Sequence, residues 1–218
     1  MRIGVYMGNL GSLEKLGYYI QERELTSNPG LERALAALID QLEPAGVTWL
    51  AGGSVGLWLQ GVSLSAQPRD IDIYAEKAAA SLIHERLKPL ATDEPRWDES
   101  GIYASLLSHY SMDGYTLELV GGFEVHTSLA DYKVEVEPLL EDAALTVVPG
   151  LKVMPLAHEF IFNLLRGRPD RYRPIADRMN TDPGRFMPLL KQIITRNGWT
   201  LQQQAAMSQL ARLEGWFD

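Results

Sequence analysis

The 218-residue sequence contains no cysteine. Disulfide bonds, iron–sulfur clusters, zinc sites built on thiolates and cysteine nucleophiles are therefore all excluded. The lack of cysteine is compatible with a reducing compartment. Any catalytic or metal-binding chemistry in this chain has to come from carboxylates, hydroxyls, histidines and backbone groups.

Long apolar segments are also missing. No apolar run approaches the ~20 residues that a membrane-spanning helix needs. The N-terminal residues 1–6 lack the basic region and long apolar stretch of a signal peptide. We therefore expect a cytoplasmic protein with no membrane partner.

Basic residues are scarce in the first two thirds of the chain. The formal net charge is −8; residues 1–150 carry −12 and residues 151–218 carry +4. A protein that coats nucleic acid needs a basic surface, so the overall charge argues against that class. The mildly basic C-terminal part could still bind the phosphates of a nucleotide locally.

The hydrophobic fraction of 46% is that of an ordinary folded protein. The order of periodic segments predicts a mixed α/β (α+β) fold, in which a small sheet is flanked by helices and followed by a helical tail. We divide the chain into an N-terminal extension (1–29), an α/β domain (30–150) and a helical C-terminal region (151–218).

Apolar spacing and turn residues predict the individual elements. Helices are expected at 13–24, 31–42, 55–60, 75–88, 157–165, 175–179, 186–196 and 201–215. Strands are expected at 47–51, 70–74, 102–110, 115–120 and 145–148, and around Val134 and Val136.

Two adjacent glycines and a serine follow the strand predicted at 47–51. Gly52 and Gly53 let the backbone turn sharply and approach a bulky ligand with no Cβ in the way. The helix that follows directs its N-terminal amides toward an anion. The hydroxyl of Ser54 can donate to a phosphate. Taken alone, the same residues also fit a plain strand-to-helix turn.

Two aspartates alternate with isoleucines in the strand predicted at 70–74. Asp70 and Asp72, two residues apart, lie on one face of that strand. Such a pair offers hard oxygen ligands for a divalent cation such as Mg²⁺, although a solvated strand face has the same pattern. Glu118, between Leu117 and Leu119, is our choice for a third carboxylate, and Glu124 competes for that role.

The order of these motifs resembles that of the nucleotidyltransferase superfamily, which includes DNA polymerase beta, aminoglycoside and lincosamide nucleotidyltransferases, and minimal bacterial nucleotidyltransferases. Gly52, Gly53 and Ser54 take the place of the glycine turn, and Asp70, Asp72 and Glu118 that of the acids. Residues 155–171 also resemble a helix and basic turn that are common after this domain. The resemblance covers roughly residues 31–180.

This resemblance implies an enzyme that moves a nucleotidyl group from a nucleoside triphosphate, such as ATP, to a hydroxyl. Asp70, Asp72 and Glu118 would be catalytic and would bind two Mg²⁺ ions. Gly52, Gly53 and Ser54 would bind the nucleotide. From its own position beside Asp70, Arg69 could also bind the nucleotide by directing phosphates into the site, although an exposed arginine in an ion pair fits that position nearly as well. The acceptor could be a small molecule, a protein side chain or an RNA end.

Two other interpretations stay open. Gly52, Ser54 and Gly56 satisfy the Gly-x-Ser-x-Gly pattern of a serine hydrolase, with Asp131 and His158 downstream in the right order. That interpretation leaves the Asp70-x-Asp72 pair without a role. The chain could also be a catalytically inactive nucleotide-binding or interaction module of the same fold. The fingerprints of a P-loop and of a dinucleotide-binding fold are absent from the sequence.

Overall fold

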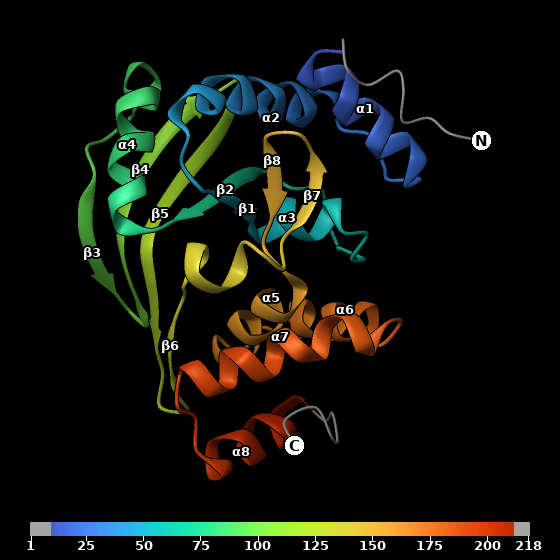
Figure 1. Cartoon of the computed structure of the whole chain (residues 1–218), viewed down its shortest axis with the longest axis vertical. Coiled ribbons are helices and arrows are strands. Elements are labelled where there is room, and N and C mark those ends of the chain that lie inside the picture. The colour runs from blue at the N-terminus through green and yellow to red at the C-terminus, as the bar shows by residue number, and fades with distance from the viewer. Residues whose placement is uncertain (1–9, 212–218) are drawn as a thin grey trace.

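A mixed eight-stranded sheet forms the centre of the computed structural model, which describes residues 10–211 (Figure 1). Its strands are β1 (Leu50–Gly52), β2 (Asp70–Ala75), β3 (Arg96–Ser100), β4 (Tyr103–Met112), β5 (Tyr115–His126), β6 (Asp131–Lys133), β7 (Leu145–Val148) and β8 (Leu151–Val153). Seven of them run in the order β3-β4-β5-β2-β1-β8-β7, and β6 pairs with the far end of β5.

The centre of the sheet contains both parallel and antiparallel pairs. Strand β2 pairs with β1 antiparallel and with β5 parallel. Strand β1 also pairs with β8, in parallel. Because β5, β2 and β1 are neighbours in the middle of the sheet, residues from three distant parts of the sequence lie side by side there.

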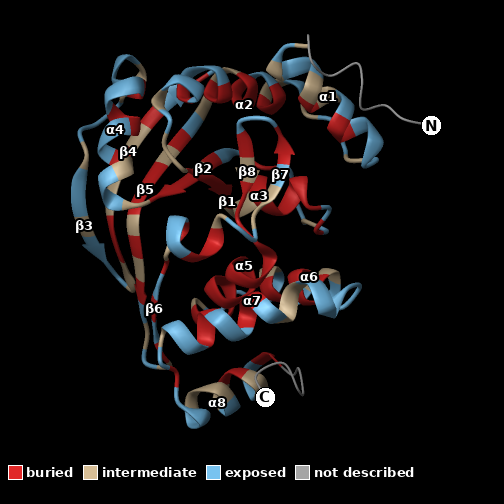
Figure 2. Cartoon of the chain, in the orientation of Figure 1, coloured by how far each residue is buried: buried red, intermediate tan, exposed pale blue. Residues whose placement is uncertain are grey.

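The helices are α1 (Ser12–Glu22), α2 (Pro29–Leu42), α3 (Gly53–Leu59), α4 (Lys77–Leu87), α5 (Leu156–Leu165), α6 (Pro169–Met179), α7 (Pro183–Arg196) and α8 (Leu201–Ala211). Helices α1, α2 and α4 lie on one side of the sheet, and α5 to α8 lie on the other (Figure 1). Each side encloses its own hydrophobic core, seen as the buried faces in Figure 2.

Strand β2 lies between the two cores, and its side chains point alternately into one core and the other. Ile71, Ile73 and Ala75 are buried with α2 and α4 in one core. Tyr74 is buried in the other core, on the side of α5. Since neighbouring side chains on a strand point to opposite faces, Asp72 faces the α5 side as well. Apolar burial on one face of β2 thus directs its acids to the other.

The sequence predicted the fold class and most elements, and the mixed α/β class with a helical C-terminal part is confirmed. Strand β3 was missed, because its residues are mostly exposed and carry no apolar alternation. The strand expected around Val134 and Val136 is shifted toward the N-terminus: β6 ends at Lys133, and residues 136–140 form a short helical turn that buries Val136. The end of the helix predicted at 201–215 lies outside the described residues.

The predicted boundaries near residues 30 and 151 stay predictions. Residues 151–153 form β8, which pairs with β1 and β7 inside the main sheet. Helix α1 shares the core of α2 through Leu16 and Ile20. Within residues 10–211, no helix combines the length and the apolar character that crossing a membrane demands.

Candidate active site

The glycine turn lies where β1 ends and α3 begins. Gly53 has a φ of +57°, a left-handed conformation that favours glycine. A Cβ on Gly53 would overlap the carboxylate of Asp72, and a Cβ on Gly52 would come within 2.6 Å of the Tyr74 ring. The two glycines are therefore needed for close approach as well as for backbone conformation.

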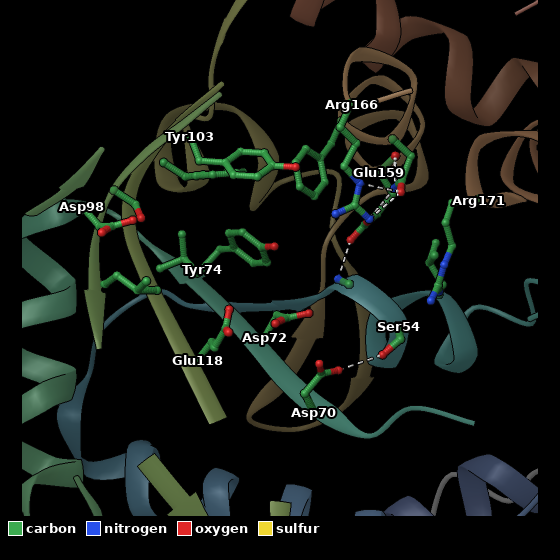
Figure 3. Close-up of a pocket in the computed structure, with 18 of the residues that line it drawn as sticks. Ser54, Asp70, Asp72, Tyr74, Asp98, Tyr103, Glu118, Glu159, Arg166 and Arg171 are labelled. Carbon is green, nitrogen blue, oxygen red and sulfur yellow. Dashed lines mark hydrogen bonds between the residues drawn. The ribbon is translucent and has the colours of Figure 1, made fainter. Parts of the chain in front are cut away.

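The two predicted aspartates lie beside this turn (Figure 3). Asp72 is opposite Gly52 in the β1–β2 pair, so the strand register fixes the acid against the turn. The hydroxyl of Ser54 lies 3.4 Å from Oδ1 of Asp70 and donates to it. Asp70 and Asp72 both line the same pocket as Gly53 and Ser54.

Glu118 joins the aspartates from the neighbouring strand. It lies opposite Asp72 in the parallel β2–β5 pair and lines the pocket with it. His109, across on β4, has Nε2 3.6 Å from Glu118 Oε1, and its Nδ1 lies 2.6 Å from Asp93 Oδ2. Glu124 lies six residues further along β5, outside the pocket lining, with a carboxylate oxygen 3.4 Å from His126 Nε2. The structure thus places Glu118, rather than Glu124, with the aspartates.

The pocket that these residues line has a volume of about 320 Å³. Its two sides differ in chemistry. Ser54, Arg166 and Arg171 lie toward one side, and Asp98 and Tyr103 lie toward the other, above β3 and β4 (Figure 3). Aromatic rings complete the second side: Tyr103 lies 5.9 Å from Phe123 and 6.1 Å from Phe162 between ring centroids. The aspartates and Glu118 lie between the two sides, at the floor.

Like charges and burial act together on Asp72. Burial raises the pKa of its carboxyl to about 7, and the charges of Asp70, Glu118 and Glu159 add to that rise. A cation between these carboxylates would offset both effects, and carboxylate oxygens are the ligands that Mg²⁺ prefers. The donor set therefore fits a divalent cation. In residues 10–211, however, no three His, Asp or Glu side chains are already grouped so that they could hold a metal ion together.

A buried glutamate that sequence reasoning missed supports the turn. Glu159, on α5, is 1% exposed, and its Oε1 accepts a hydrogen bond of 2.8 Å from the backbone amide of Gly53. Asn163 donates to Oε2 of Glu159 at 3.3 Å, and Arg166 donates to Oδ1 of Asn163 at 2.7 Å. Burial raises the pKa of Glu159 to about 7, and its bond to Gly53 and the charge of Arg166 oppose this rise.

The arginines near the site separate into distinct roles. Arg69, predicted to bind the nucleotide, is exposed just before β2 and does not line the pocket. Arg166 and Arg171 do line it. Arg168 is bound instead to Asp170, with two hydrogen bonds of 2.9 and 2.7 Å. Arg166 and Arg171 therefore line the pocket with the acids, while Arg168 pairs with Asp170 at the surface, where Arg171 Nε also lies 4.0 Å from Oδ2 of Asp170.

The residues required by the hydrolase interpretation do not meet. His158 is fully buried, and its Nδ1 lies 2.7 Å from the hydroxyl of Tyr132. Asp131 lies 3.1 Å from His126, at the exposed end of β6. Ser54 has Asp70 as its side-chain partner. This chain therefore has no serine–histidine–aspartate triad at these positions.

Comparison with known proteins shows what the fold of this chain resembles. No family model matches the chain, and no curated protein matches its sequence. A provisionally named nucleotidyltransferase from Thermotoga maritima superposes with a TM-score of 0.58 and 22% identity, over 73% of this chain and 98% of that chain.

Two antibiotic-modifying enzymes are weaker matches. They are ANT(2'')-Ia in complex with adenylyl-2''-tobramycin (11% identity, 73% of this chain and 94% of that chain) and the lincosamide adenylyltransferase LnuA (14% identity, 66% and 96%). Both have a TM-score of 0.43. The fold of this chain is nucleotidyltransferase-like, as its motifs predicted.

Proposed function

We propose that this protein is a metal-dependent nucleotidyltransferase that uses a nucleoside triphosphate and a hydroxyl acceptor. One observation carries the proposal: Asp70, Asp72 and Glu118 line a single pocket together with the Gly53-Ser54 turn. These are the acids and the turn that the nucleotidyl-transfer motif combines. The nucleotidyltransferase-like fold supports the proposal, and the role of each residue follows from this chain's own side chains.

Asp70, Asp72 and Glu118 would hold Mg²⁺, and two ions would suit three carboxylates beside a triphosphate. When bound, the metal would stabilise the negative charge on the phosphates. The raised pKa of Asp72 supports this assignment, because a buried carboxylate among other acids is stabilised by a nearby cation.

The triphosphate would occupy the side of the pocket that contains Ser54, Arg166 and Arg171. Arginine is suited to phosphate because its planar guanidinium donates two parallel hydrogen bonds. The amide of Gly53 is already used by Glu159, so the turn would contact phosphate through Ser54. Glu159 therefore serves to fix the turn.

The acceptor would occupy the side that contains Asp98 and Tyr103. Its hydroxyl would approach the α-phosphorus next to Glu118. The new bond forms between the acceptor oxygen and the α-phosphorus, the bond to the β-phosphate oxygen breaks, and pyrophosphate leaves. Glu118 would accept the hydroxyl proton. The enzyme's main contribution is to position the two reactants.

The pocket size favours a small molecule or a single protruding group as the acceptor, because its volume of about 320 Å³ has to take the reacting part of the nucleotide as well. A protein side chain or the terminal hydroxyl of an RNA also presents only one group to the reaction. The acidic character of residues 1–150 makes a large RNA the least favoured of the three.

The test separates nucleotide binding from transfer, because the acceptor is unidentified. Binding of each of the four ribonucleoside triphosphates is measured by calorimetry with Mg²⁺ and with EDTA. We expect wild-type protein to bind at least one of them in Mg²⁺ only, and the Asp70→Asn/Asp72→Asn double variant not to bind. Label from the α-phosphate is then followed into antibiotics, protein and RNA, each offered separately.

A matched control removes two negative charges elsewhere. Asp142→Asn/Asp177→Asn changes two exposed aspartates that form no ion pair in the described part of the chain, and it should bind as wild type does. Metal-independent binding, or wild-type transfer by the Asp70/Asp72 variant, would reject the mechanism. Magnesium-dependent binding without transfer to any acceptor would instead indicate a nucleotide-binding module.

A further inference from the structure

Three arginines surround a small surface pocket away from the candidate active site. Arg23 follows α1, Arg178 is in the last turn of α6, and Arg185 is in the first turn of α7. All three line the same pocket, together with Gln60 and Phe186. None of these residues lines the pocket that contains the catalytic acids.

The three guanidinium groups have neutral partners only. Arg23 lies over the ring of Tyr19, and Arg185 lies over the ring of Phe186, each 5.2 Å from the ring centroid. Arg178 donates to the carbonyl of Gln60 at 3.2 Å and to the hydroxyl of Thr181 at 2.7 Å. These contacts hold the arginines in place without neutralising their charge.

No carboxylate compensates them within residues 10–211. The ion pairs of the described residues involve other cations, and none reaches Arg23, Arg178 or Arg185 within 4.0 Å. This is unusual for a chain with a net charge of −8, in which acids outnumber basic residues. Three like charges around one pocket repel one another, and a bound anion would relieve that repulsion.

The charges of the three arginines also affect the same group, the hydroxyl of Tyr19. Burial raises the pKa of Tyr19, and the positive charges of Arg23, Arg185 and Arg178 all oppose that rise. The hydroxyl of Tyr19 donates to the carbonyl of Leu59 at 2.9 Å, at the end of α3. The three arginines therefore converge on one place in the fold, where α1, α3, α6 and α7 meet.

We propose that Arg23, Arg178 and Arg185 form a second anion site, which binds a phosphate group. The pocket itself, with a volume of about 10 Å³, has room for no more than one water molecule, so the phosphate would lie at its mouth. The exposed side chains of Arg23 and Arg185 would donate to its oxygens there together with Arg178. This site is distinct from the catalytic one and is separated from it by the length of α3, from Gly53 to Leu59.

The phosphate could be free or could belong to a nucleotide strand. Arg171 lines the catalytic pocket, and Arg178 lies seven residues later on the same face of α6. Seven residues correspond to about 10 Å along a helix. One side of α6 therefore places Arg171 at the first pocket and Arg178 at the second, with the uncharged Pro174 and Ile175 between them. This alternative rests on the proposed function: a strand whose end is in the catalytic pocket could reach Arg178 with a later phosphate.

The test uses the whole chain without metal or nucleoside triphosphate, and the probe is inorganic phosphate, followed by calorimetry. The informative variant is Arg23→Ala/Arg185→Ala, because both side chains are exposed and neither forms a hydrogen bond within residues 10–211. Arg178 is left in place because it binds the end of α3. The matched control is Arg33→Ala/Lys191→Ala, which removes two exposed cations elsewhere that form no ion pair with any other residue of the described range 10–211.

We expect phosphate to bind wild-type and control protein equally, and the Arg23/Arg185 variant at least ~10-fold more weakly. A second arm repeats the comparison with a single-stranded RNA of eight nucleotides at two salt concentrations. Weaker and salt-dependent RNA binding by the variant identifies a strand as the source of the phosphate. An effect on inorganic phosphate alone identifies a free phosphate ligand. Wild-type protein that binds neither probe, or a variant that binds both as wild type does, overturns the proposal.

Discussion

Glu159 accepts a hydrogen bond of 2.8 Å from the backbone amide of Gly53, a residue 106 positions earlier in the chain. This bond joins α5, from the helical C-terminal part, to the turn between β1 and α3. A glutamate with 1% exposure would be costly to bury without partners, so its bonds to Gly53 and Asn163 are part of what makes its position tolerable. The helical part of the chain therefore helps to shape the candidate active site.

The burial of Glu159 predicts a pH-dependent stability. Its pKa is raised from 4.5 to about 7 in the folded protein, so between these pH values the folded state binds more protons than the unfolded state. The contribution of Glu159 to stability is present at low pH and is lost as the pH rises through 7, by ~3 kcal/mol in total. Urea unfolding at pH 5, 6, 7 and 8 measures it.

The variant for this measurement is Glu159→Gln, which keeps an oxygen for the Gly53 amide but cannot ionise. We expect its unfolding free energy to fall less between pH 5 and 8 than that of wild type, by ~3 kcal/mol. Asp72 titrates in both proteins, but the charge of Glu159 contributes to its raised pKa, so the difference reports Glu159 together with its coupling to Asp72. Glu137→Gln, at an exposed position, should reproduce the wild-type slope. An unchanged slope in Glu159→Gln would show that Glu159 ionises normally.

The Gly53 position predicts a second, separable effect. Gly53→Ala would introduce a left-handed alanine and a Cβ that overlaps the Asp72 carboxylate. Gly61→Ala has the same backbone penalty, with φ +70°, but its Cβ would meet nothing within 4 Å. Each variant should lose ~1–2 kcal/mol of stability from backbone strain, and Gly53→Ala should lose more.

Nucleotide binding distinguishes the two glycine variants. We expect Gly61→Ala to bind nucleoside triphosphate and Mg²⁺ as wild type does, and Gly53→Ala to bind at least ~10-fold more weakly, because Asp72 has to move. Calorimetry at a temperature where both variants are folded gives the comparison. Equal binding by the two would mean that the approach of Asp72 to the turn has no part in ligand binding.

Local sequence patterns were sufficient for one part of the site. The alternation around Asp70 and Asp72 fixed which face of β2 they share, since Ile71 and Ile73 have to be buried on the other. Glu118 followed from the same reasoning on β5, although alternation alone left Glu124 open. The choice between them depends on the register of the β2–β5 pair, which aligns Asp72 with Glu118 and is a long-range property of the sheet.

The remaining part could not be read from the sequence for physical reasons. Glu159 lies in an apolar helix whose period predicts burial but gives no partner, and its bond to Gly53 exists only after the helical part packs on the sheet. Asp98 lies on an exposed edge strand without apolar alternation, so neither the strand nor its place in the pocket was expected. Arg69 was predicted to bind nucleotide by proximity to Asp70, but it precedes β2 and stays outside the pocket lining.

The crowding of acids predicts that Asp72, a proposed metal ligand, destabilises the metal-free protein. Asp72 has a pKa of about 7 because of burial and the charges of Asp70, Glu118 and Glu159. In EDTA at pH 8, Asp72→Asn removes that charge and should raise the melting temperature, by roughly 2–4 °C for each kcal/mol of relief. Mg²⁺ should raise the melting temperature of wild type and leave that of Asp72→Asn unchanged.

The control for Asp72→Asn is Asp177→Asn, which removes a charge from an exposed position on α6. It should change neither the melting temperature in EDTA nor the response to Mg²⁺. Differential scanning fluorimetry with and without metal gives all of these values. If Asp72→Asn melts at or below the wild-type temperature in EDTA, the repulsion among the carboxylates is too weak to favour the binding of a cation.

The third carboxylate gives a comparison within one strand. Glu118 and Glu124 are both on β5, but only Glu118 lines the pocket beside Asp72. If Glu118 accepts the proton of the acceptor hydroxyl, Glu118→Gln should lower the rate of pyrophosphate release by ~10²–10⁴-fold, the usual contribution of a positioned base. Glu124→Gln should keep the wild-type rate, because that carboxylate contacts His126 instead.

The rates are measured in Mg²⁺ with the nucleotide and acceptor found by the transfer assay, and circular dichroism checks that both variants are folded. Full activity in Glu118→Gln, or an equal loss in both, would show that proton removal does not depend on this position and would leave Glu118 at most a metal ligand.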